Sequence, residues 1–304
     1  MNDLVTDVKS LELETLQNLK SSKAANTLRA YKADYKDFAK FCLKSGFKPM
    51  PSEPKVISLY LTYLSKSCKF STLKRRLASI SVIHRLSGHY IDVKHPMITE
   101  NLMGIKRIKG SYQKAKKPLL INDLKSIVNV IDKDKNEKNR FKNRALILIG
   151  FSGGFRRSEL VAIQYDDVDF VTEGVKIFVR RSKTDQSGEG MTKGIPYFSN
   201  PEYCPVISLK KWIENSEIKS GKIFDMSDKS VALIIKKYTA IAGLDSNKYS
   251  GHSLRSGFAT STAELGAEER SIMAMTGHKT TQMVRRYIQE ANLFKNVKIV
   301  KCII

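Results

Sequence analysis

Apolar residues recur at helical spacing along most of this 304-residue chain. Positions three and four apart share one face of an α-helix, so such a stripe is buried while charged side chains occupy the other faces. Near the N-terminus the stripe consists of Leu28, Tyr31, Tyr35, Phe38 and Cys42. Two more helices are expected over residues 55–66, after a proline-rich loop, and over residues 71–87, before Gly88. The pattern therefore predicts an all-helical N-terminal domain.

A basic segment containing Gly110 and Ser111 interrupts this periodicity at residues 106–117. Its six basic residues are Lys106, Arg107, Lys109, Lys114, Lys116 and Lys117. Such a segment buries little apolar surface and is typical of an interdomain linker. The chain length also suits two domains. We therefore assign residues 1–110 to the N-terminal domain, 111–117 to the linker and 118–304 to a C-terminal domain with a tail.

The pattern after Pro118 is mixed. Strands are expected at 168–170, 175–179 and 194–198, with a polar hairpin tip at 182–193. Helices are expected after Asn122 and over residues 141–151, 205–217, 229–242, 253–265, 268–275 and 280–290. The C-terminal domain is thus predicted to be mainly α, with a small antiparallel β-sheet.

The charge of the chain points to a polyanionic partner. The net charge is +23, and both parts contribute, with 23 basic and 9 acidic residues in 1–117 and 30 and 21 in the remainder. Lysines and arginines bind DNA by releasing its condensed counterions, and two basic domains suit a clamp around a duplex. The scattered cysteines (Cys42, Cys68, Cys204 and Cys302) indicate neither a disulfide framework nor a metal site.

The chain contains no long apolar segment. The longest apolar stretch is residues 145–151, which is too short to span a membrane, and residues 1–20 lack the apolar core of a signal peptide. We expect a cytoplasmic protein with no membrane partner.

Two imidazoles, a guanidinium and a phenol lie within 36 residues near the C-terminus: His252, Arg255, His278 and Tyr287. His252 and Arg255 are three positions apart and can share a helix face. A phenol, with a pKa of about 10, is a poor nucleophile at neutral pH. Fixed cations that align and neutralise a phosphodiester can make it effective. The cluster therefore indicates covalent chemistry on a DNA backbone.

The order of these residues resembles the tyrosine recombinases, or phage-integrase family. That family has His-x-x-Arg, then Gly-His or Gly-Trp, then a nucleophilic tyrosine nine positions on, as His278 and Tyr287 are spaced here. Residues 153–160, Gly-Gly-Phe-Arg-Arg-Ser-Glu-Leu, resemble the turn with the family's first arginine, which falls on Arg156. Residues 179–185 resemble its hairpin lysine segment, which falls on Lys183. The basic residues that flank it, on which a shifted alignment would fall, are Arg180, Arg181 and Lys193. The resemblance spans about residues 20 to 295 and is closest to the two-domain Xer-like or Cre-like type.

The resemblance implies a role for each residue. Tyr287 would form a 3′-phosphotyrosyl link, and Lys183 would protonate the departing 5′-oxygen. The remaining catalytic positions would be Arg156 and Arg255 on the phosphate oxygens, His252 as acid–base group and His278 as hydrogen-bond donor, with Glu159 in support. Covalent capture conserves the bond energy, so no cofactor is expected, and no acidic cluster suggests a metal. Arg157 departs from the family, which commonly has an apolar residue there.

The resemblance extends to the N-terminal domain, which looks like the family's core-binding domain in residues 26–31. DNA contacts are expected from Arg29, Lys74, Arg75 and Arg76, the alternative being a solvated helix face. The implied partners are double-stranded DNA with inverted-repeat core sites, three further protomers in a tetramer on two sites, and accessory proteins in some members. The apolar residues of the tail 291–304 would dock into a neighbouring protomer or pack on their own domain.

Two other functions use the same residues. A type IB topoisomerase-like enzyme would cut without strand exchange, and a non-catalytic regulator would only bind DNA. The complete set of six motif residues argues against the regulator, and the small separate N-terminal domain favours a site-specific recombinase over a topoisomerase.

Overall fold

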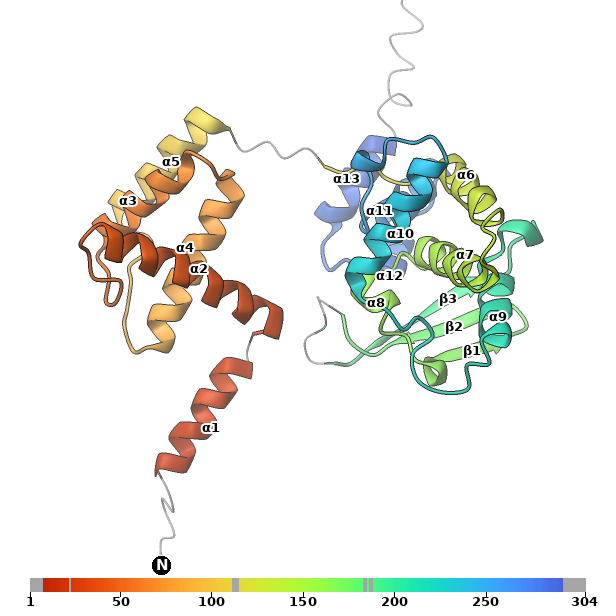
Figure 1. The fold of residues 1–304 in the computed structure, drawn as a ribbon, viewed down its shortest axis with the longest axis horizontal. Coiled ribbons are helices and arrows are strands. Elements are labelled where there is room, and N and C mark those ends of the chain that lie inside the picture. Colours follow the sequence, from red (N-terminus) through yellow and green to blue (C-terminus); the bar gives the residue numbers. More distant parts are fainter. Residues whose placement is uncertain (1–7, 22, 111–114, 183–184, 186–187, 292–304) are drawn as a thin grey trace, which may run out of the picture. The chain divides into compact units, whose positions relative to one another are not determined.

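The computed structural model describes residues 8–21, 23–110, 115–182, 185 and 188–291. The chain forms two compact units that divide between Lys114 and Ala115 (Figure 1). Lys183 and the tail from residue 292 lie outside the described residues. No helix of the described residues is long and apolar enough to cross a membrane.

The N-terminal unit is helical, as the periodicity predicted. Its helices are α1 (Val8–Ser21), α2 (Ala25–Lys44), α3 (Pro54–Ser65), α4 (Phe70–Leu86) and α5 (Pro96–Lys109). Helix α2 packs on α4 and α3 packs on α5. The core draws on both pairs and includes Phe38, Tyr60, Leu61, Leu73, Ile80 and Ile98. Helices α1 and α5 were not predicted.

Helix α5 corrects the start of the basic segment. Lys106, Arg107 and Lys109 lie in its last turn, where cations interact favourably with the helix dipole, and Gly110 follows with φ +70°. The apolar side of the helix buries Ile98 and Ile105. A basic helix end therefore looked like a linker in sequence.

The other end of the basic segment is held by the C-terminal unit. The Lys117 N–H donates to the Lys248 carbonyl at 2.8 Å, and the Lys116 ammonium donates to the Asn247 carbonyl at 2.6 Å. The Leu119 N–H then donates to the Ser253 carbonyl at 2.9 Å. A Cβ on Gly257 would lie only 1.9 Å from the Leu119 oxygen, so this glycine allows the entering chain to cross helix α11 (Ser253–Glu264).

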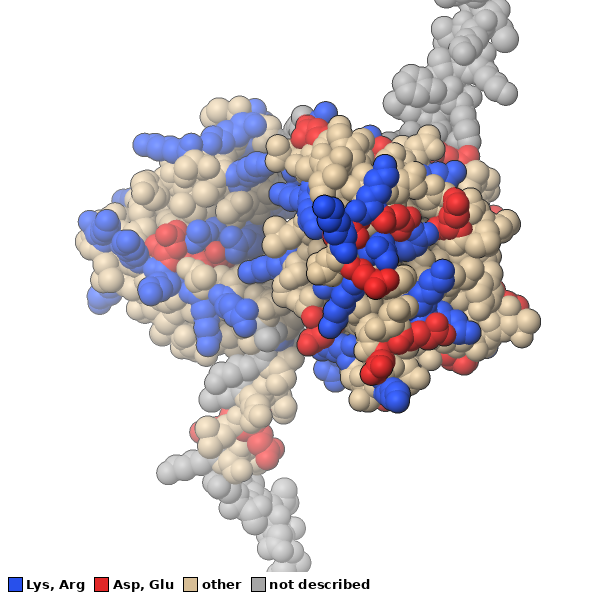
Figure 2. All heavy atoms as spheres, turned by 45° about the vertical axis from the view of Figure 1, so that its right-hand side comes forward, with Lys and Arg blue, Asp and Glu red and all other residues tan. Residues whose placement is uncertain are grey.

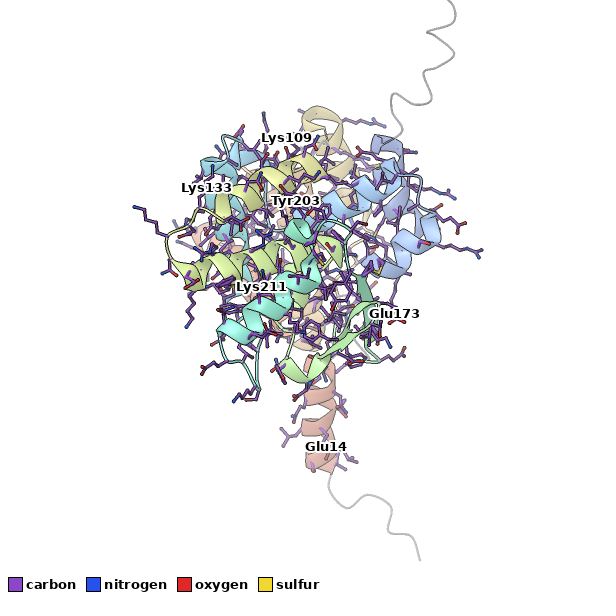
Figure 3. The ribbon with its side chains drawn as sticks, turned by 90° about the vertical axis from the view of Figure 1, so that its right-hand side faces the viewer. Glu14, Lys109, Lys133, Glu173, Tyr203 and Lys211 are labelled. Atoms are coloured by element: carbon purple, nitrogen blue, oxygen red, sulfur yellow. The ribbon has the colours of Figure 1, made fainter. Side chains whose placement is uncertain are left out.

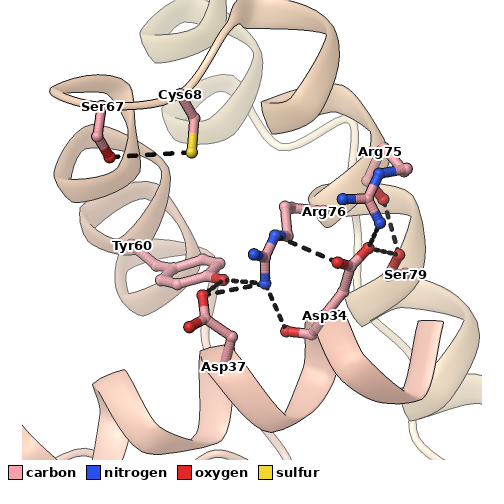
Figure 4. A network of polar contacts seen from close by, with 8 residues as sticks. All are labelled: Asp34, Asp37, Tyr60, Ser67, Cys68, Arg75, Arg76 and Ser79. Carbon is pink, nitrogen blue, oxygen red and sulfur yellow. Dashed lines mark hydrogen bonds and ion pairs between the residues drawn. The ribbon is translucent and has the colours of Figure 1, made fainter. Parts of the chain in front are cut away.

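A buried carboxylate, Asp34, organises one side of the N-terminal unit (Figure 4). It accepts a hydrogen bond from Ser79 Oγ at 2.7 Å and pairs with the guanidinium of Arg75. The Arg76 Nε lies 3.3 Å from Asp34, and its Nη1 lies 3.0 Å from the Asp37 carboxylate and 3.2 Å from the Tyr60 hydroxyl. The network ties α4 to α2 and α3.

The C-terminal unit surrounds one mostly buried helix with helices and a small sheet. The elements are α6 (Ile121–Ile131), α7 (Glu137–Ser152), α8 (Arg157–Leu160), β1 (Val168–Val171), β2 (Gly174–Val179), β3 (Met191–Pro196), α9 (Pro205–Asn215), α10 (Asp228–Ile241), α11 (Ser253–Glu264), α12 (Glu269–Thr276) and α13 (Thr281–Ala291), with short 3₁₀ turns at Tyr165–Asp167, Pro201–Tyr203 and Ser246–Lys248. Helix α7 contacts α6, α9 and α11, which explains its unbroken apolar run. Charged side chains such as Lys133, Glu173 and Lys211 extend outward (Figure 3).

The sheet is antiparallel with strand order β1-β2-β3. In its register Ile177 of β2 faces Lys193 of β3, and Val175 faces Ile195. Strand β3 begins at Met191, so residues 191–193, which were expected in the hairpin tip, belong to the strand. The predicted fold class, mainly α with a small antiparallel sheet, is confirmed.

Candidate active site

A glycine turn presents Arg156. Helix α7 ends at Ser152, and Gly154 adopts φ +56°, where an added Cβ would also crowd the Phe258 ring at 3.0 Å. Arg156 then caps helix α8. The Glu159 carboxylate accepts from the Arg156 N–H at 2.9 Å and pairs with its guanidinium. Because Glu159 is 4% exposed, this pairing fixes the arginine firmly.

Arg255 lies on the first turn of α11 and is 1% exposed. Its Nη1 donates to the Gly154 carbonyl at 2.9 Å, while Nε and Nη2 are buried and have no hydrogen-bond partner among the described residues. Unsatisfied buried donors are unfavourable unless an acceptor reaches them. Burial, with Arg156 nearby, lowers the pKa of Arg255 to about 10, so it stays charged at neutral pH. Helices α12 and α13 pack on α11, the helix that carries these donors.

The phenol and the two imidazoles lie together beside these arginines. The Tyr287 hydroxyl of α13 is 3.5 Å from Nε2 of His252, which is exposed at the start of α11. The Tyr287 ring centroid is 6.1 Å from that of His278. His278 follows Gly277, which ends α12 with φ +62°, and the Gly277 carbonyl lies 3.5 Å from Nη2 of Arg156.

His278 is neutral in this environment. Burial, followed by the charges of Arg255 and Arg156, lowers its pKa to about 4. Its Nδ1 lies 2.7 Å from Thr276 Oγ1, whose hydroxyl lies 2.5 Å from the Ile272 carbonyl. The hydroxyl has one proton, which the carbonyl must accept, so Nδ1 of His278 carries a proton and donates.

The structure thus brings together Arg156, His252, Arg255, His278 and Tyr287 from α8, α11, α12 and α13. These residues supply cationic donors and an imidazole within reach of a phenol, and the buried carboxylate of Glu159 holds Arg156. Such a site suits a phosphodiester that is attacked by the phenol. Among the described residues, no group of three or more His, Cys, Asp or Glu side chains could hold a metal ion.

Comparison with known proteins shows the family of the chain. The model of the phage integrase family matches residues 118–293. An integrase/recombinase xerD homolog of Selenomonas ruminantium is 40% identical over 97% of this chain and 90% of its own length. This chain belongs to the phage integrase family of tyrosine recombinases. A tyrosine recombinase of Agathobacter rectalis is 25% identical over 96% of this chain and 94% of its own.

Solved tyrosine recombinases share the fold. XerH in a post-cleavage complex with palindromic difH superposes with a TM-score of 0.66 at 18% identity, covering 89% of this chain and 79% of XerH. Lambda integrase (residues 75–356), a dimer bound to a COC′ core site, has a TM-score of 0.58 at 18% identity, covering 92% and 95%. The resemblance read from the motifs is therefore confirmed at the level of family and fold.

Arg157, where this recombinase departs from the family pattern, lies against the His252 turn. A Cβ on Gly251 would come within 1.8 Å of Arg157 Cδ, so the arginine stem occupies the space that the glycine leaves. Its guanidinium lies 3.6 Å from the Asp228 carboxylate. Arg157 therefore alters the local packing, and its positive charge is paired with Asp228 of α10.

The sequence offered Lys193 of β3 only as a neighbour of Lys183 on which the hairpin lysine could fall, and its burial was not expected. Its side chain is 1% exposed, and its ammonium donates to the carbonyls of Gly153 at 2.7 Å and Met275 at 2.6 Å. The signal was the strand alternation, since Lys193 lies between inward-facing Ile195 and Met191 at a spacing of two. Assigning residue 193 to a hairpin tip concealed it.

The four predicted DNA contacts of the N-terminal unit differ in their surroundings. Arg29 and Lys74 are exposed, and Arg29 Nη1 donates to the Asn26 side chain at 3.3 Å. The Arg75 side chain is 45% exposed, whereas that of Arg76 is 18% exposed and is occupied by the Asp34 network. Lys and Arg side chains dominate the face of this unit seen in Figure 2. Arg29, Lys74 and Arg75 are accessible, while Arg76 is held inward.

Proposed function

We propose that this protein is a site-specific DNA recombinase that integrates, excises or resolves DNA through a 3′-phosphotyrosyl intermediate. The observation that carries the proposal is the distance of 3.5 Å between the Tyr287 hydroxyl and Nε2 of His252. Beside them lie Arg255, with two buried donors, and Arg156, paired with Glu159. The solved relatives that share the fold include recombinases bound to DNA core sites.

The chemistry begins with the phenol of Tyr287. Its oxygen attacks the scissile phosphorus, and the phenolic proton passes to His252 Nε2 as the bond to the 5′-oxygen breaks. The 5′-oxygen leaves as a hydroxyl, with Lys183 as its proposed proton donor. In the second step a 5′-hydroxyl attacks the phosphotyrosine, which restores the phosphodiester and the phenol. The bond count is unchanged, so strand joining needs no energy source and no cofactor.

The arginines stabilise the charge that develops on phosphorus. Arg156 and Arg255 would donate to the non-bridging oxygens, each contact contributing about 3 kcal/mol to the transition state by analogy with oxyanion donors. For Arg255 the donors are the buried Nε and Nη2 atoms. His278 would donate to the same phosphate after taking up a proton, which the bound anion favours. Glu159 supports Arg156.

The N-terminal unit would bind the duplex through its accessible basic side chains, Arg29, Lys74 and Arg75. We do not assign a DNA contact to Arg76 because aspartates and Tyr60 occupy its guanidinium. The proposed substrate is double-stranded DNA with inverted-repeat core sites, bound by a tetramer across two sites in the cytoplasm. Accessory proteins and docking of the tail, residues 292–304, between protomers belong to the same proposal.

A covalent-capture assay tests the function. Wild type, Tyr287→Phe and the exposed-tyrosine control Tyr197→Phe are incubated with duplexes that flank the protein's own gene, then denatured, and the protein-linked DNA is sequenced. Wild type and Tyr197→Phe should capture one site, and Tyr287→Phe should capture none. Equal capture by Tyr287→Phe rejects the nucleophile. Tight binding without capture by wild type supports the regulator, and capture without exchange between two captured duplexes supports a topoisomerase-like enzyme.

A further inference from the structure

Lys193 is the most deeply buried lysine of the catalytic unit that the proposed chemistry does not use. Its ammonium is 4.5 Å from the Phe155 ring centroid and contacts two main-chain carbonyls. Burial of an ammonium is strongly unfavourable unless its N–H groups find acceptors and its charge finds an opposite charge. Here burial lowers the pKa of Lys193 to about 7, with Glu159 opposing the shift and Arg255 and Arg156 adding to it. Ile or Val would pack at this strand position without that penalty, so the lysine has a role beyond filling the core.

The two carbonyls belong to the segments that carry the proposed catalytic groups. Gly153 begins the turn that leads to Arg156, and the next carbonyl, that of Gly154, accepts from Arg255. Met275 is in the last turn of α12, which ends immediately before Gly277 and His278. One ammonium therefore bridges two loops that are more than a hundred residues apart in sequence, with rigid strand β3 as its base.

We propose that Lys193 is a positioning residue that holds the Arg156 turn and the His278 turn at a fixed separation, so that Arg156 and His278 can contact the same phosphate. The proposal rests on the function inferred above for its link to catalysis, but the positioning itself can be measured in the free protein. In this role Lys193 does not contact DNA, because its ammonium donates to the Gly153 and Met275 carbonyls.

The first test is hydrogen exchange of the full chain without DNA, comparing wild type, Lys193→Met and Lys176→Met. Methionine keeps the length of lysine and removes its donors, and Lys176 is an exposed lysine on neighbouring β2. The Gly154 N–H donates to Phe151 at 2.9 Å and the Gly277 N–H donates to Met273 at 2.7 Å, so exchange at these amides reports on both turns. Lys193→Met should speed exchange at both turns by about 10-fold, the equivalent of one or two lost hydrogen bonds, and leave α9 unchanged.

The second test separates cleavage from binding. The duplex recovered in the capture assay, nicked near its cleavage point to trap the covalent product, is used at saturation well below the unfolding temperature of each variant. Lys193→Met should slow the first-order formation of covalent product by about 10- to 100-fold, because small misplacements of catalytic groups have effects of that size. Its affinity for the duplex should stay within about 3-fold of wild type, because no phosphate contact is lost. Lys176→Met should match wild type in cleavage.

The outcomes distinguish the two proposals. Wild-type exchange at both turns in Lys193→Met overturns the positioning role whatever the cleavage rate, and wild-type cleavage in that variant overturns its catalytic relevance. If wild type itself forms no covalent product while exchange responds as expected, the proposed function fails and the positioning role stands. If Lys193→Met does not fold, as judged by Trp212 fluorescence, Lys193→Gln retains amide donors and should give intermediate values in both assays.

Discussion

Removing the buried carboxylate of Asp34 should destabilise the N-terminal unit alone. Asp34 is 3% exposed and forms ion pairs with the guanidiniums of Arg75 and Arg76. It also accepts a hydrogen bond from the Ser79 hydroxyl. Leaving a buried charge without its partner typically costs about 3–5 kcal/mol. Arg75 is half-exposed and can turn to water, and Arg76 keeps its pairing with Asp37, so the lower end applies. We expect Asp34→Ala to lower the free energy of unfolding by about 3 kcal/mol.

The single tryptophan allows the two units to be followed separately. Trp212 is buried in the C-terminal unit, so its fluorescence reports that unit, while circular dichroism reports the helices of both. With an m-value of about 1.5 kcal/mol/M, Asp34→Ala should move part of the circular dichroism transition about 2 M lower in urea, with no change in the fluorescence midpoint.

The matched control is Asp37→Ala. The Asp37 side chain is 46% exposed, so its loss should lower stability by about 1 kcal/mol or less. Two results would refute the reasoning. One is a shift for Asp34→Ala no larger than that for Asp37→Ala, and the other is an equal shift of the Trp212 transition.

Two other perturbations follow from single hydrogen bonds. His84 is fully buried, its pKa is lowered chiefly by burial, and its Nε2 accepts from the Ser52 N–H at 3.2 Å. The unfolded state therefore binds a proton first, and the N-terminal unit should lose stability as pH falls below about 6.5, by up to about 1.4 kcal/mol per pH unit, in urea titrations by circular dichroism. His84→Gln should remove this dependence, and a flat wild-type profile from pH 7.5 to 5 would contradict the assignment. Thr276→Val should remove the acceptor that keeps the proton on Nδ1 of His278. Covalent capture should slow by about 5- to 10-fold, the equivalent of one hydrogen bond of about 1 kcal/mol, and DNA affinity should not change. Wild-type capture by this variant would mean that Thr276 does not orient the ring.

The sequence predicted the elements wherever local periodicity decides them. The helix over residues 71–87 was found as α4, Phe70–Leu86, because an apolar stripe of period 3.6 can be buried on one side only. Helix α5 was missed because its last turn is basic, which is favourable at a helix C-terminus but looks like a linker in composition. Strand β3 was placed too late because a lysine occupied an inward position.

The chemistry of the site was likewise accessible from the sequence. Residue types and spacing indicated the phenol, Arg255 and the imidazoles, because fixed cations make a phenol effective on a phosphodiester and helix geometry puts His252 beside Arg255. The family resemblance added Arg156 and Lys183. The family comparison confirms the family that the motifs indicated. The sequence by itself therefore determined the family and the residues that define its proposed reaction.

Only the tertiary structure decided which polar side chains are buried and what they hold. Arg76 looked like its neighbour Arg75 in sequence, yet it is turned toward Asp34, which lies 42 residues away. The contacts of Arg255 with Gly154 and of Lys193 with Met275 span 101 and 82 residues. Periodicity records the face of an element that is buried, but it does not record the element that covers it. A buried cation is tolerated only where distant segments bring carbonyls or carboxylates to it, so its partners exist only once the chain has folded.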